Sequence, residues 1–202
     1  LLRDGYVCVP GEQKRFYGVA KRVVDFFAAI CGIVLALPIM LVITAAIKYT
    51  DGGPVIHTRI CEGKNGQKYK MYKFRSMVMD ADDLERWLTP QQIKTYITEC
   101  KLENDPRITR IGRFIRKTSM DELPQLFSVL EGNMSMVGPR PVVESEITNY
   151  SISSAERLLS AKPGITGYWQ VNGRSDSTYV SGKRQEMELY YVENRSLTLD
   201  SK

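Results

Sequence analysis

Two neighbouring carboxylates, Asp121 and Glu122, stand in a segment whose residue types suit phosphate chemistry. Ser119 followed three residues later by Glu122 predicts a capping box, and Pro124 suits the first turn of a helix. We therefore expect both carboxylates at a helix N-terminus, where free N–H groups and the helix dipole hold Asp121 ionised. An ionised Asp121 is suited to act as a nucleophile, and the two carboxylates together suit a Mg²⁺ ion beside a diphosphate. The structural alternative is a pair of acids that only cap the helix.

A rigid arginine loop is predicted at Gly138-Pro139-Arg140-Pro141. Pro139 and Pro141 fix φ at two positions, and Pro141 pushes Arg140 towards an extended conformation. A guanidinium suits phosphate because its planar fork donates two parallel hydrogen bonds. We assign Pro139, Arg140 and Pro141 to the substrate site, and the alternative is a structural proline-rich turn that carries a solvated arginine.

A set of basic residues accompanies the carboxylates. Lys73 and Arg75 lie on a predicted strand, while Arg107, Arg110 and Arg113 recur at a spacing of three, on one face if that segment is helical. These cations are suited to neutralise a diphosphate or to bind lipid headgroups. We assign Lys73, Arg75 and Arg107 to the substrate site, and a solvated charged face is the alternative.

A glycine-rich stretch covers Lys162–Gly167, and residues 169–174 follow it. Glycine permits a close approach of the backbone to a ligand. Arg174 suits a mobile phosphate clamp, and we assign Gln170 with it to the substrate site. Trp169 suits stacking on a base or anchoring at a membrane interface, with core packing as an equal alternative.

Composition and missing motifs narrow the chemistry. The 202-residue chain carries a formal charge of +5, which suits an anionic partner such as a phosphorylated substrate, a membrane surface or nucleic acid. It has one histidine, so the acid, base or nucleophile has to come mainly from carboxylate, serine, cysteine or lysine side chains. Its four scattered cysteines form no CxxC pair and fit a reducing cytosol. The sequence contains no Walker A, Rossmann or zinc-protease motif.

A hydrophobic run from Phe26 to Ile47 contains no charged residue and is long enough to span a membrane. Basic residues flank it on both sides, so both ends favour the cytoplasmic face. Pro38 lies inside the run and breaks or kinks a helix, and each arm beside it is too short to cross about 30 Å of hydrocarbon. We therefore expect an N-terminal re-entrant membrane helix-break-helix. A kinked single span and a buried core helix are the alternatives.

The remaining chain is expected to fold as a small α/β (α+β) domain that is mostly helical. The stretches Val55–Arg59 and Lys68–Met77 read as short strands joined by turn formers, which predicts a β-hairpin. Helices are predicted at residues 81–100 (divided by Pro90), 121–130, 141–159 and 182–192, with a loop or short strand at 162–171.

Three segments are expected along the chain. Residues 1–20 form a lead-in or linker, residues 21–50 the membrane hairpin, and residues 51–202 a cytoplasmic catalytic domain. Because the chain starts at Leu1 and not at Met, we expect it to be part of a longer protein.

Six segments, in the same order along the chain, resemble the bacterial sugar transferase family, the monotopic phosphoglycosyl transferases. The resemblance covers roughly residues 18–200. The segments are Lys21-Arg22-Val23-Val24-Asp25, Tyr72-Lys73-Phe74-Arg75-Ser76-Met77, Asn104-Asp105-Pro106-Arg107-Ile108-Thr109-Arg110, Asp121-Glu122-Leu123-Pro124-Gln125-Leu126, Gly138-Pro139-Arg140-Pro141 and Lys162-Pro163-Gly164-Ile165-Thr166-Gly167.

The resemblance implies a monotopic enzyme of the bacterial cytoplasmic (inner) membrane whose catalytic domain faces the cytoplasm. Such enzymes move a sugar phosphate from a UDP-sugar to polyprenyl (undecaprenyl) phosphate and release UMP, the first membrane step of glycoconjugate assembly. The resemblance also implies a covalent phosphosugar intermediate on Asp121, with Glu122 as its partner and Mg²⁺ as the cofactor. Pro139, Arg140 and Pro141 fall on the family's loop for the nucleotide diphosphate. Membrane phospholipids are expected partners, nucleic acid is not, and a homodimer is left open.

The chain departs from the family's usual pattern at several positions. Leu37 stands where serine often precedes the membrane proline, Glu188 where aspartate is common, and Arg195 where tryptophan is common. Two other functions compete with the enzyme: a non-catalytic membrane scaffold of the same fold, and a membrane-tethered nucleic-acid-binding domain with steeply salt-dependent affinity. The sequence leaves the sugar open.

Overall fold

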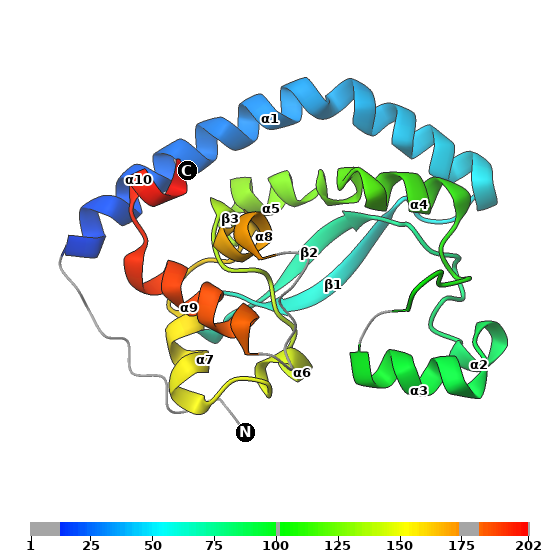
Figure 1. Cartoon of the computed structure of the whole chain (residues 1–202). Helices are drawn as coiled ribbons and strands as arrows, with labels where there is room; N and C mark the ends of the chain where they lie inside the picture. The colour runs from blue at the N-terminus through cyan, green and yellow to red at the C-terminus, as the bar shows by residue number, and fades with distance from the viewer. Residues whose placement is uncertain (1–12, 100–101, 174–181, 202) are drawn as a thin grey trace. The chain divides into compact units, whose positions relative to one another are not determined.

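The computed structural model describes residues 13–99, 102–173 and 182–201 (Figure 1). The chain divides into two compact units, and each is described by itself. The first unit takes in residues up to 35, residues 58–72 and residues from 125 onward, and the second takes in 36–57 and 73–124.

The N-terminal helix α1 (Gln13–Asp51) runs without interruption through Pro38, as the blue and cyan ribbon in Figure 1 shows. The expected break into two helical arms is therefore wrong at the level of secondary structure, because the turns before and after Pro38 keep the helical backbone. The boundary between the two units falls in α1 between Leu35 and Ala36, within one turn of Pro38. Residues Tyr17–Asp51 have a mean hydropathy of 2.8 in their most apolar window, so the helix is long and apolar enough to cross a membrane.

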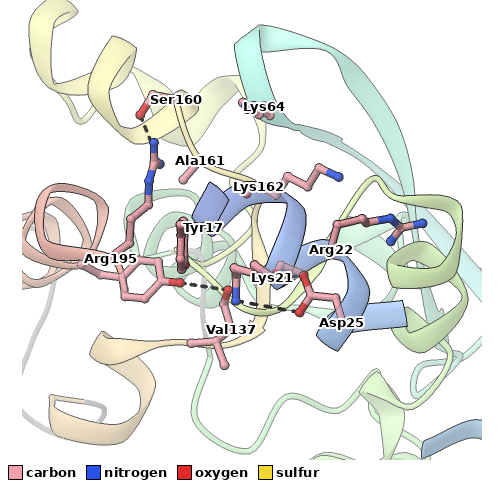
Figure 2. Close-up of a pocket in the computed structure, with 13 residues that line it drawn as sticks. Tyr17, Lys21, Arg22, Asp25, Lys64, Val137, Ser160, Ala161, Lys162 and Arg195 are labelled. Atoms are coloured by element: carbon pink, nitrogen blue, oxygen red, sulfur yellow. Dashed lines mark hydrogen bonds and ion pairs between the residues drawn. The ribbon is translucent and has the colours of Figure 1, made fainter. Parts of the chain in front are cut away.

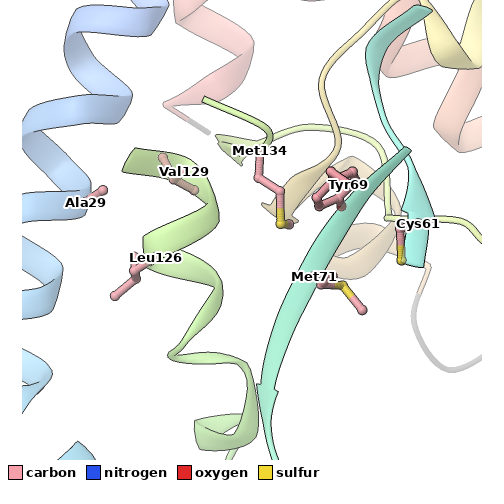
Figure 3. Close-up of a cluster of buried hydrophobic side chains, with 7 residues drawn as sticks. All are labelled: Ala29, Cys61, Tyr69, Met71, Leu126, Val129 and Met134. Atoms are coloured by element: carbon pink, nitrogen blue, oxygen red, sulfur yellow. The ribbon is translucent and has the colours of Figure 1, made fainter. Parts of the chain in front are cut away.

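In the first unit, α1 buries one face and exposes the other. Asp25 and Ala29 are buried, whereas Val23, Val24 and Phe27 are exposed. Ala29 packs into a cluster with side chains from α5 (Gln125–Glu131) and from the hairpin strands, which Figure 3 shows. The remaining buried members of this cluster are Cys61, Tyr69, Met71, Leu126, Val129 and Met134.

The predicted hairpin is confirmed, with β1 (Ile56–Glu62) paired to β2 (Lys68–Phe74). The turn between them contains a short 3₁₀ helix, η1 (Lys64–Gly66), in which Asn65 adopts a left-handed φ of 59°. Asparagine tolerates this backbone conformation better than most residues, so Asn65 permits the turn that joins the two strands.

A second sheet joins two distant segments in parallel. Strand β3 (Ser135–Val137) pairs with β4 (Gly164–Thr166), with Ser135 opposite Gly164. The backbones approach so closely that a Cβ atom on Gly164 would lie 2.1 Å from the backbone nitrogen of Gly138. Only glycine fits there, and this packing places the Pro-Arg-Pro loop directly after β3.

The other helices of the first unit are short. The predicted helix at 141–159 forms as two helices because Ser151 caps a new start, its side chain accepting from the N–H of Ser154. Helix α9 (Lys183–Asn194) packs against both α7 (Ile152–Leu159) and α8 (Tyr168–Asn172). The helices are α6 (Glu144–Ile147), α7 (Ile152–Leu159), α8 (Tyr168–Asn172), α9 (Lys183–Asn194) and α10 (Leu197–Asp200).

The second unit holds α2 (Leu84–Trp87), α3 (Pro90–Glu99), α4 (Arg110–Lys117) and the 3₁₀ turn η2 (Met120–Glu122). Pro90 is the first residue of α3, as its missing N–H favours. Thr109 caps α4 by accepting from the N–H of Gly112 at 3.0 Å. The core of this unit is formed by Met40, Ile43, Ile47, Phe74 and Ile115. The mostly helical fold with small sheets is thus as expected.

Candidate active site

Asp121 lies in the turn η2, which precedes Pro124 and α5 in the chain. Its side chain is 9% exposed and forms no hydrogen bond to another side chain of the described residues. Two cations of the same unit, Lys73 and Arg116, act on its charge. Arg116 is itself fixed, because its Nε donates a 2.7 Å hydrogen bond to Ser76 Oγ. Asp121 is therefore a buried carboxylate close to two cations. Its oxygens form no hydrogen bond with the side chains of the described residues.

Glu122 is engaged by a cation. The ammonium of Lys73 donates to Glu122 Oε1 at 2.7 Å, and both side chains are partly exposed. The sequence assigned Lys73 to substrate and Glu122 to catalysis, and the second unit brings these two residues together with Asp121. Lys73 thus has a carboxylate partner before any phosphate binds.

The predicted capping box is wrong. Ser119 adopts a left-handed φ of 57° and its side chain makes no capping hydrogen bond, so Glu122 belongs to the 3₁₀ turn rather than to a regular helix start. Burial raises the pKa of Asp121, and Lys73 offsets part of that rise while Glu122 adds to it. The cations near Asp121, rather than a helix cap, are therefore what favours its ionised form.

Two arginines assigned to the substrate have carboxylate partners in the structure. Arg75 is buried and forms an ion pair with Asp51 at the end of α1. Arg107 is 2% exposed; its Nε and Nη2 donate to Asp105, and its Nη1 donates to the Ala81 carbonyl at 3.1 Å. The Arg107 guanidinium therefore links Asp105, in the loop before α4, to the backbone at Ala81.

The Pro-Arg-Pro loop belongs to the first unit. The backbone N–H of Arg140 donates to Glu188 Oε2 at 2.9 Å, and the carbonyl of Pro139 accepts from the Gly164 N–H at 2.8 Å. The Arg140 guanidinium lies 5.7 Å from the centre of the Trp169 ring, and its Nε has no hydrogen-bond partner among the described residues. Arg140 is therefore fixed at its backbone while its side chain retains donors.

Glu188 is a residue beside the Pro-Arg-Pro loop that sequence reasoning did not assign to a site. Its side chain is only 3% exposed, and burial raises its pKa to about 7, although the Arg140 N–H and the charges of Arg184 and Arg140 oppose the rise. Arg184 lies over the same Trp169 ring at 4.6 Å. The sequence signal that pointed to it is its place in the family pattern, where Glu188 stands at a position at which aspartate is common.

The three remaining predicted substrate residues have different outcomes. Gln170 lies in α8 and donates to the Ile165 carbonyl at 3.1 Å, while its Oε1 is buried and unpaired among the described residues. Pro141, beside Arg140, is partly buried. Arg174 lies outside the described residues.

The carboxylates fit a Mg²⁺ ion only as part of a larger ligand set. Within the described residues there is no cluster of three or more metal-ligating side chains. Mg²⁺ commonly uses one or two carboxylates together with substrate phosphates and water. Asp121 fits this role because no side chain of the described residues hydrogen-bonds to it, whereas one oxygen of Glu122 is occupied by Lys73.

A comparison with known protein families identifies the class of protein. The model of the family described as bacterial sugar transferase matches residues 16–202. The chain belongs to the bacterial sugar transferase family, as the six ordered segments indicated.

Individual relatives carry more specific names. The exopolysaccharide production protein ExoY of Rhizobium meliloti is 43% identical over 193 residues, which is 94% of this chain and 84% of that protein. The undecaprenyl-phosphate galactose phosphotransferase of Salmonella typhimurium is 43% identical over 93% of this chain, which spans 39% of that protein. The UDP-glucose:undecaprenyl-phosphate glucose-1-phosphate transferase of Klebsiella pneumoniae is 40% identical over 91% of this chain and 38% of its own length.

Proposed function

We propose that this chain is a phosphoglycosyl transferase that moves a sugar 1-phosphate from a UDP-sugar to undecaprenyl phosphate or a related polyprenyl phosphate. The observation that carries the proposal is the buried Asp121 carboxylate, which has no hydrogen bond to a side chain of the described residues and is acted on by Lys73 and Arg116. The names of the Salmonella and Klebsiella relatives support the class of reaction, and they differ in the sugar.

The reaction proceeds in two steps. A carboxylate oxygen of Asp121 attacks the phosphorus that bears the sugar, and the bond from this phosphorus to the oxygen of UMP breaks with its electron pair on UMP. A phosphate oxygen of the polyprenyl phosphate then attacks the same phosphorus and releases the Asp121 carboxylate. Each step exchanges one phosphorus–oxygen bond for another, so a single small site serves two bulky substrates in turn.

Charge on the transferring group has to be offset throughout. Lys73 and Arg116 supply positive charge around Asp121, and phosphoryl transfer depends mainly on such positioning and electrostatics. Mg²⁺ held by Asp121 and Glu122 would add Lewis-acid stabilisation of the phosphate oxygens. We assign the diphosphate of the nucleotide to Arg140, whose guanidinium is the donor that the Pro-Arg-Pro loop presents.

We propose that α1 enters the cytoplasmic leaflet and returns to the same side. The apolar face is exposed on both sides of Pro38, and proline removes one hydrogen bond from the helix there. Single cysteines at Val19 and Tyr49, in a chain without its own cysteines, test this in inverted and right-side-out vesicles. Labelling of both by an impermeant thiol reagent from the cytoplasmic side alone supports the re-entrant arrangement. Labelling from opposite sides supports a span.

The decisive experiment compares Asp121→Asn with Asp82→Asn, a matched change at an exposed aspartate of the same unit. With a panel of UDP-sugars and undecaprenyl phosphate, we expect Asp121→Asn to lower UMP release by at least about 1,000-fold. It should also abolish trapping of labelled sugar phosphate on the protein, while Asp82→Asn keeps both. Near-normal UMP release by Asp121→Asn refutes the nucleophile, and no release by the unchanged chain with any UDP-sugar favours the scaffold.

A further inference from the structure

A recess at the start of α1 collects positive charge within the first unit. The cavity has a volume of about 160 Å³, and five cations and one carboxylate are among its lining residues (Figure 2). A second hollow of about 320 Å³ shares Lys64 and Lys162 with it and has no carboxylate among its lining residues. The charged residues that line the first cavity are Lys21, Arg22, Asp25, Lys64, Lys162 and Arg195.

Three of the five cations have partners. Lys21 is bound by Asp200 at 2.8 Å, and Arg195 donates to Ser160 Oγ at 3.5 Å. Arg22 donates to the Val129 and Leu130 carbonyls, in the last turn of α5, at 2.6 and 2.7 Å.

The two remaining cations, Lys64 and Lys162, have no such partner for their side chains among the described residues. The side chains of Lys64 and Lys162 form no hydrogen bond or ion pair with the described residues. The nearby carboxylate is already committed, because Asp25 accepts from Ser135 Oγ at 2.7 Å and from the Met136 N–H at 3.0 Å. Lys162 is therefore a partly buried ammonium without a counter-ion of its own among the described residues.

The cationic groups converge on one point. A Cβ atom at Gly132, which has a left-handed φ of 86°, would lie 3.4 Å from Arg22 Nη2 and 3.7 Å from Lys162 Nζ. Figure 2 shows both side chains extending to the same side of the recess. Burial, together with the charges of Arg22 and Lys64, lowers the pKa of Lys162, and Asp25 offsets only part of this effect. An anion at this point would relieve the repulsion.

We infer that Lys162, Lys64 and Arg22 form a binding site for a phosphate group, either on a dissolved phosphate ester or on an anionic phospholipid. A tetrahedral phosphate accepts from several donors at once, which suits two ammonium groups and a guanidinium around one hollow. Basic pockets beside membrane helices commonly take lipid headgroups, and Arg22 lies one turn before the exposed Phe26 and Phe27 on α1. The site shares no residue with the proposed reaction, so it goes beyond that function.

The first test uses the unchanged chain in nanodiscs of phosphatidylcholine. Acylation of each lysine by an amine-reactive reagent is measured by mass spectrometry with glycerol phosphate or with chloride at equal ionic strength. A bound phosphate raises the pKa of Lys162 and leaves less free amine, so its acylation should slow by at least about threefold. The exposed Lys70, which lines neither hollow, is the internal control and should not change.

A second arm replaces part of the phosphatidylcholine by phosphatidylglycerol in the absence of dissolved phosphate. Protection of Lys162 only in this arm identifies a lipid headgroup as the source, and protection only by glycerol phosphate identifies a dissolved ester. Protection in both arms supports a site that accepts either. If Lys162 and Lys70 respond alike in both arms, the proposed site does not exist.

A variant provides an independent check. Lys162→Met keeps most of the aliphatic stem and removes the charge, and Lys70→Met is the matched control. A ligand that binds the folded state raises the thermal unfolding midpoint, so the phosphate-dependent rise should vanish in Lys162→Met and persist in Lys70→Met. If phosphate raises the unfolding midpoint of Lys162→Met as much as that of the unchanged chain, the proposed site is wrong. If Lys162→Met does not fold, the labelling of the unchanged chain decides the question.

Discussion

The ammonium of Lys73 donates a 2.7 Å hydrogen bond to Glu122 while its charge also lowers the pKa of the neighbouring Asp121. One cation therefore serves two adjacent acids in different ways. It occupies an oxygen of Glu122 and leaves Asp121 to other ligands. The two neighbouring carboxylates therefore differ in their contacts: Glu122 accepts a hydrogen bond from Lys73, whereas Asp121, the proposed nucleophile, does not.

Replacing Lys73 by glutamine should change the pH dependence of the reaction. Burial already raises the pKa of Asp121, and Lys73 opposes that rise, so removing the ammonium raises the pKa further. Because the ionised carboxylate is the attacking form, the acidic limb of kcat/KM should move to higher pH. At a fixed pH on that limb, UMP release should fall about tenfold for every pH unit by which the limb moves.

The matched control is Lys70→Gln, an exposed lysine three residues earlier on β2. It should leave both the pH profile and the rate unchanged. If Lys73→Gln lowers only the thermal unfolding midpoint and keeps the acidic limb in place, then Lys73 is structural and does not tune Asp121.

Asp105 and Arg107 make a prediction about stability rather than catalysis. Burial raises the pKa of Asp105, but hydrogen bonds from the Arg107 side chain and backbone outweigh it and lower the pKa below its usual value. Asp105→Asn leaves the Arg107 guanidinium buried without its counter-ion, which typically costs about 3 kcal/mol of unfolding free energy. We expect a lower denaturation midpoint in detergent, whereas Asp82→Asn at an exposed position should cause little change.

The linked pH effect has a definite sign. A carboxyl whose folded pKa is depressed stabilises the fold above its unfolded pKa and loses that contribution as the pH falls through the folded value. The unchanged chain should therefore lose this part of its stability only in acid, and Asp105→Asn should lack the acid-dependent step. An unchanged midpoint combined with a raised KM for the UDP-sugar would instead restore Arg107 to the substrate contacts.

Glu188 predicts a pH dependence of the opposite sign. Burial raises its pKa from 4.5 to about 7, so the folded chain binds this proton more tightly than the unfolded chain. Its contribution to stability is therefore largest below pH 4.5 and falls as the pH rises to about 7. Glu188→Gln cannot ionise, so its unfolding midpoint relative to the unchanged chain should rise from about pH 5 to about pH 8.

The same position tests the support of Arg140. Glutamine still offers an oxygen to the Arg140 N–H, whereas Glu188→Leu removes the 2.9 Å hydrogen bond. We expect Glu188→Leu to raise the KM for the UDP-sugar and Glu188→Gln to stay near the starting value. Glu193→Gln, a half-exposed glutamate of α9 paired with Arg157, is the control. Equal KM values for the leucine and glutamine variants would mean that the hydrogen bond does not position Arg140.

The local elements could be predicted from the sequence where a short pattern decides the structure. Turn formers between two strand-like runs predicted the hairpin, and Pro90 marked the start of α3 because a missing N–H costs nothing in the first turn. The parallel pairing of β3 with β4 was not predicted. Each strand has only three residues, and their partnership depends on glycines that permit close backbone approach, which no periodicity reveals.

The sequence named the residue types of the candidate site, but it did not predict their backbone conformations or their contacts. Asp121, Glu122 and Lys73 were all named, yet the capping box failed because Ser119 takes a left-handed conformation that its residue type does not disclose. The ion pair of Arg107 with Asp105 was not predicted, because an arginine in a sequence looks the same whether it is solvated or paired with a buried carboxylate.

The exposed apolar face of α1 provides the last prediction. Leu35 is 78% exposed and Val42 is 70% exposed, so neither side chain supports the core and a charge at these positions should leave the fold intact. A charged group in the centre of a bilayer costs about 3 kcal/mol on insertion scales. Leu35→Glu combined with Val42→Glu should therefore shift the chain from the membrane pellet to the soluble fraction without lowering its unfolding midpoint in detergent. Ile152→Glu, at an apolar residue of α7 that is 76% exposed, should remain in the pellet. If the double variant also remains there and leaves only in high salt, the basic residues rather than this face hold the protein on the membrane.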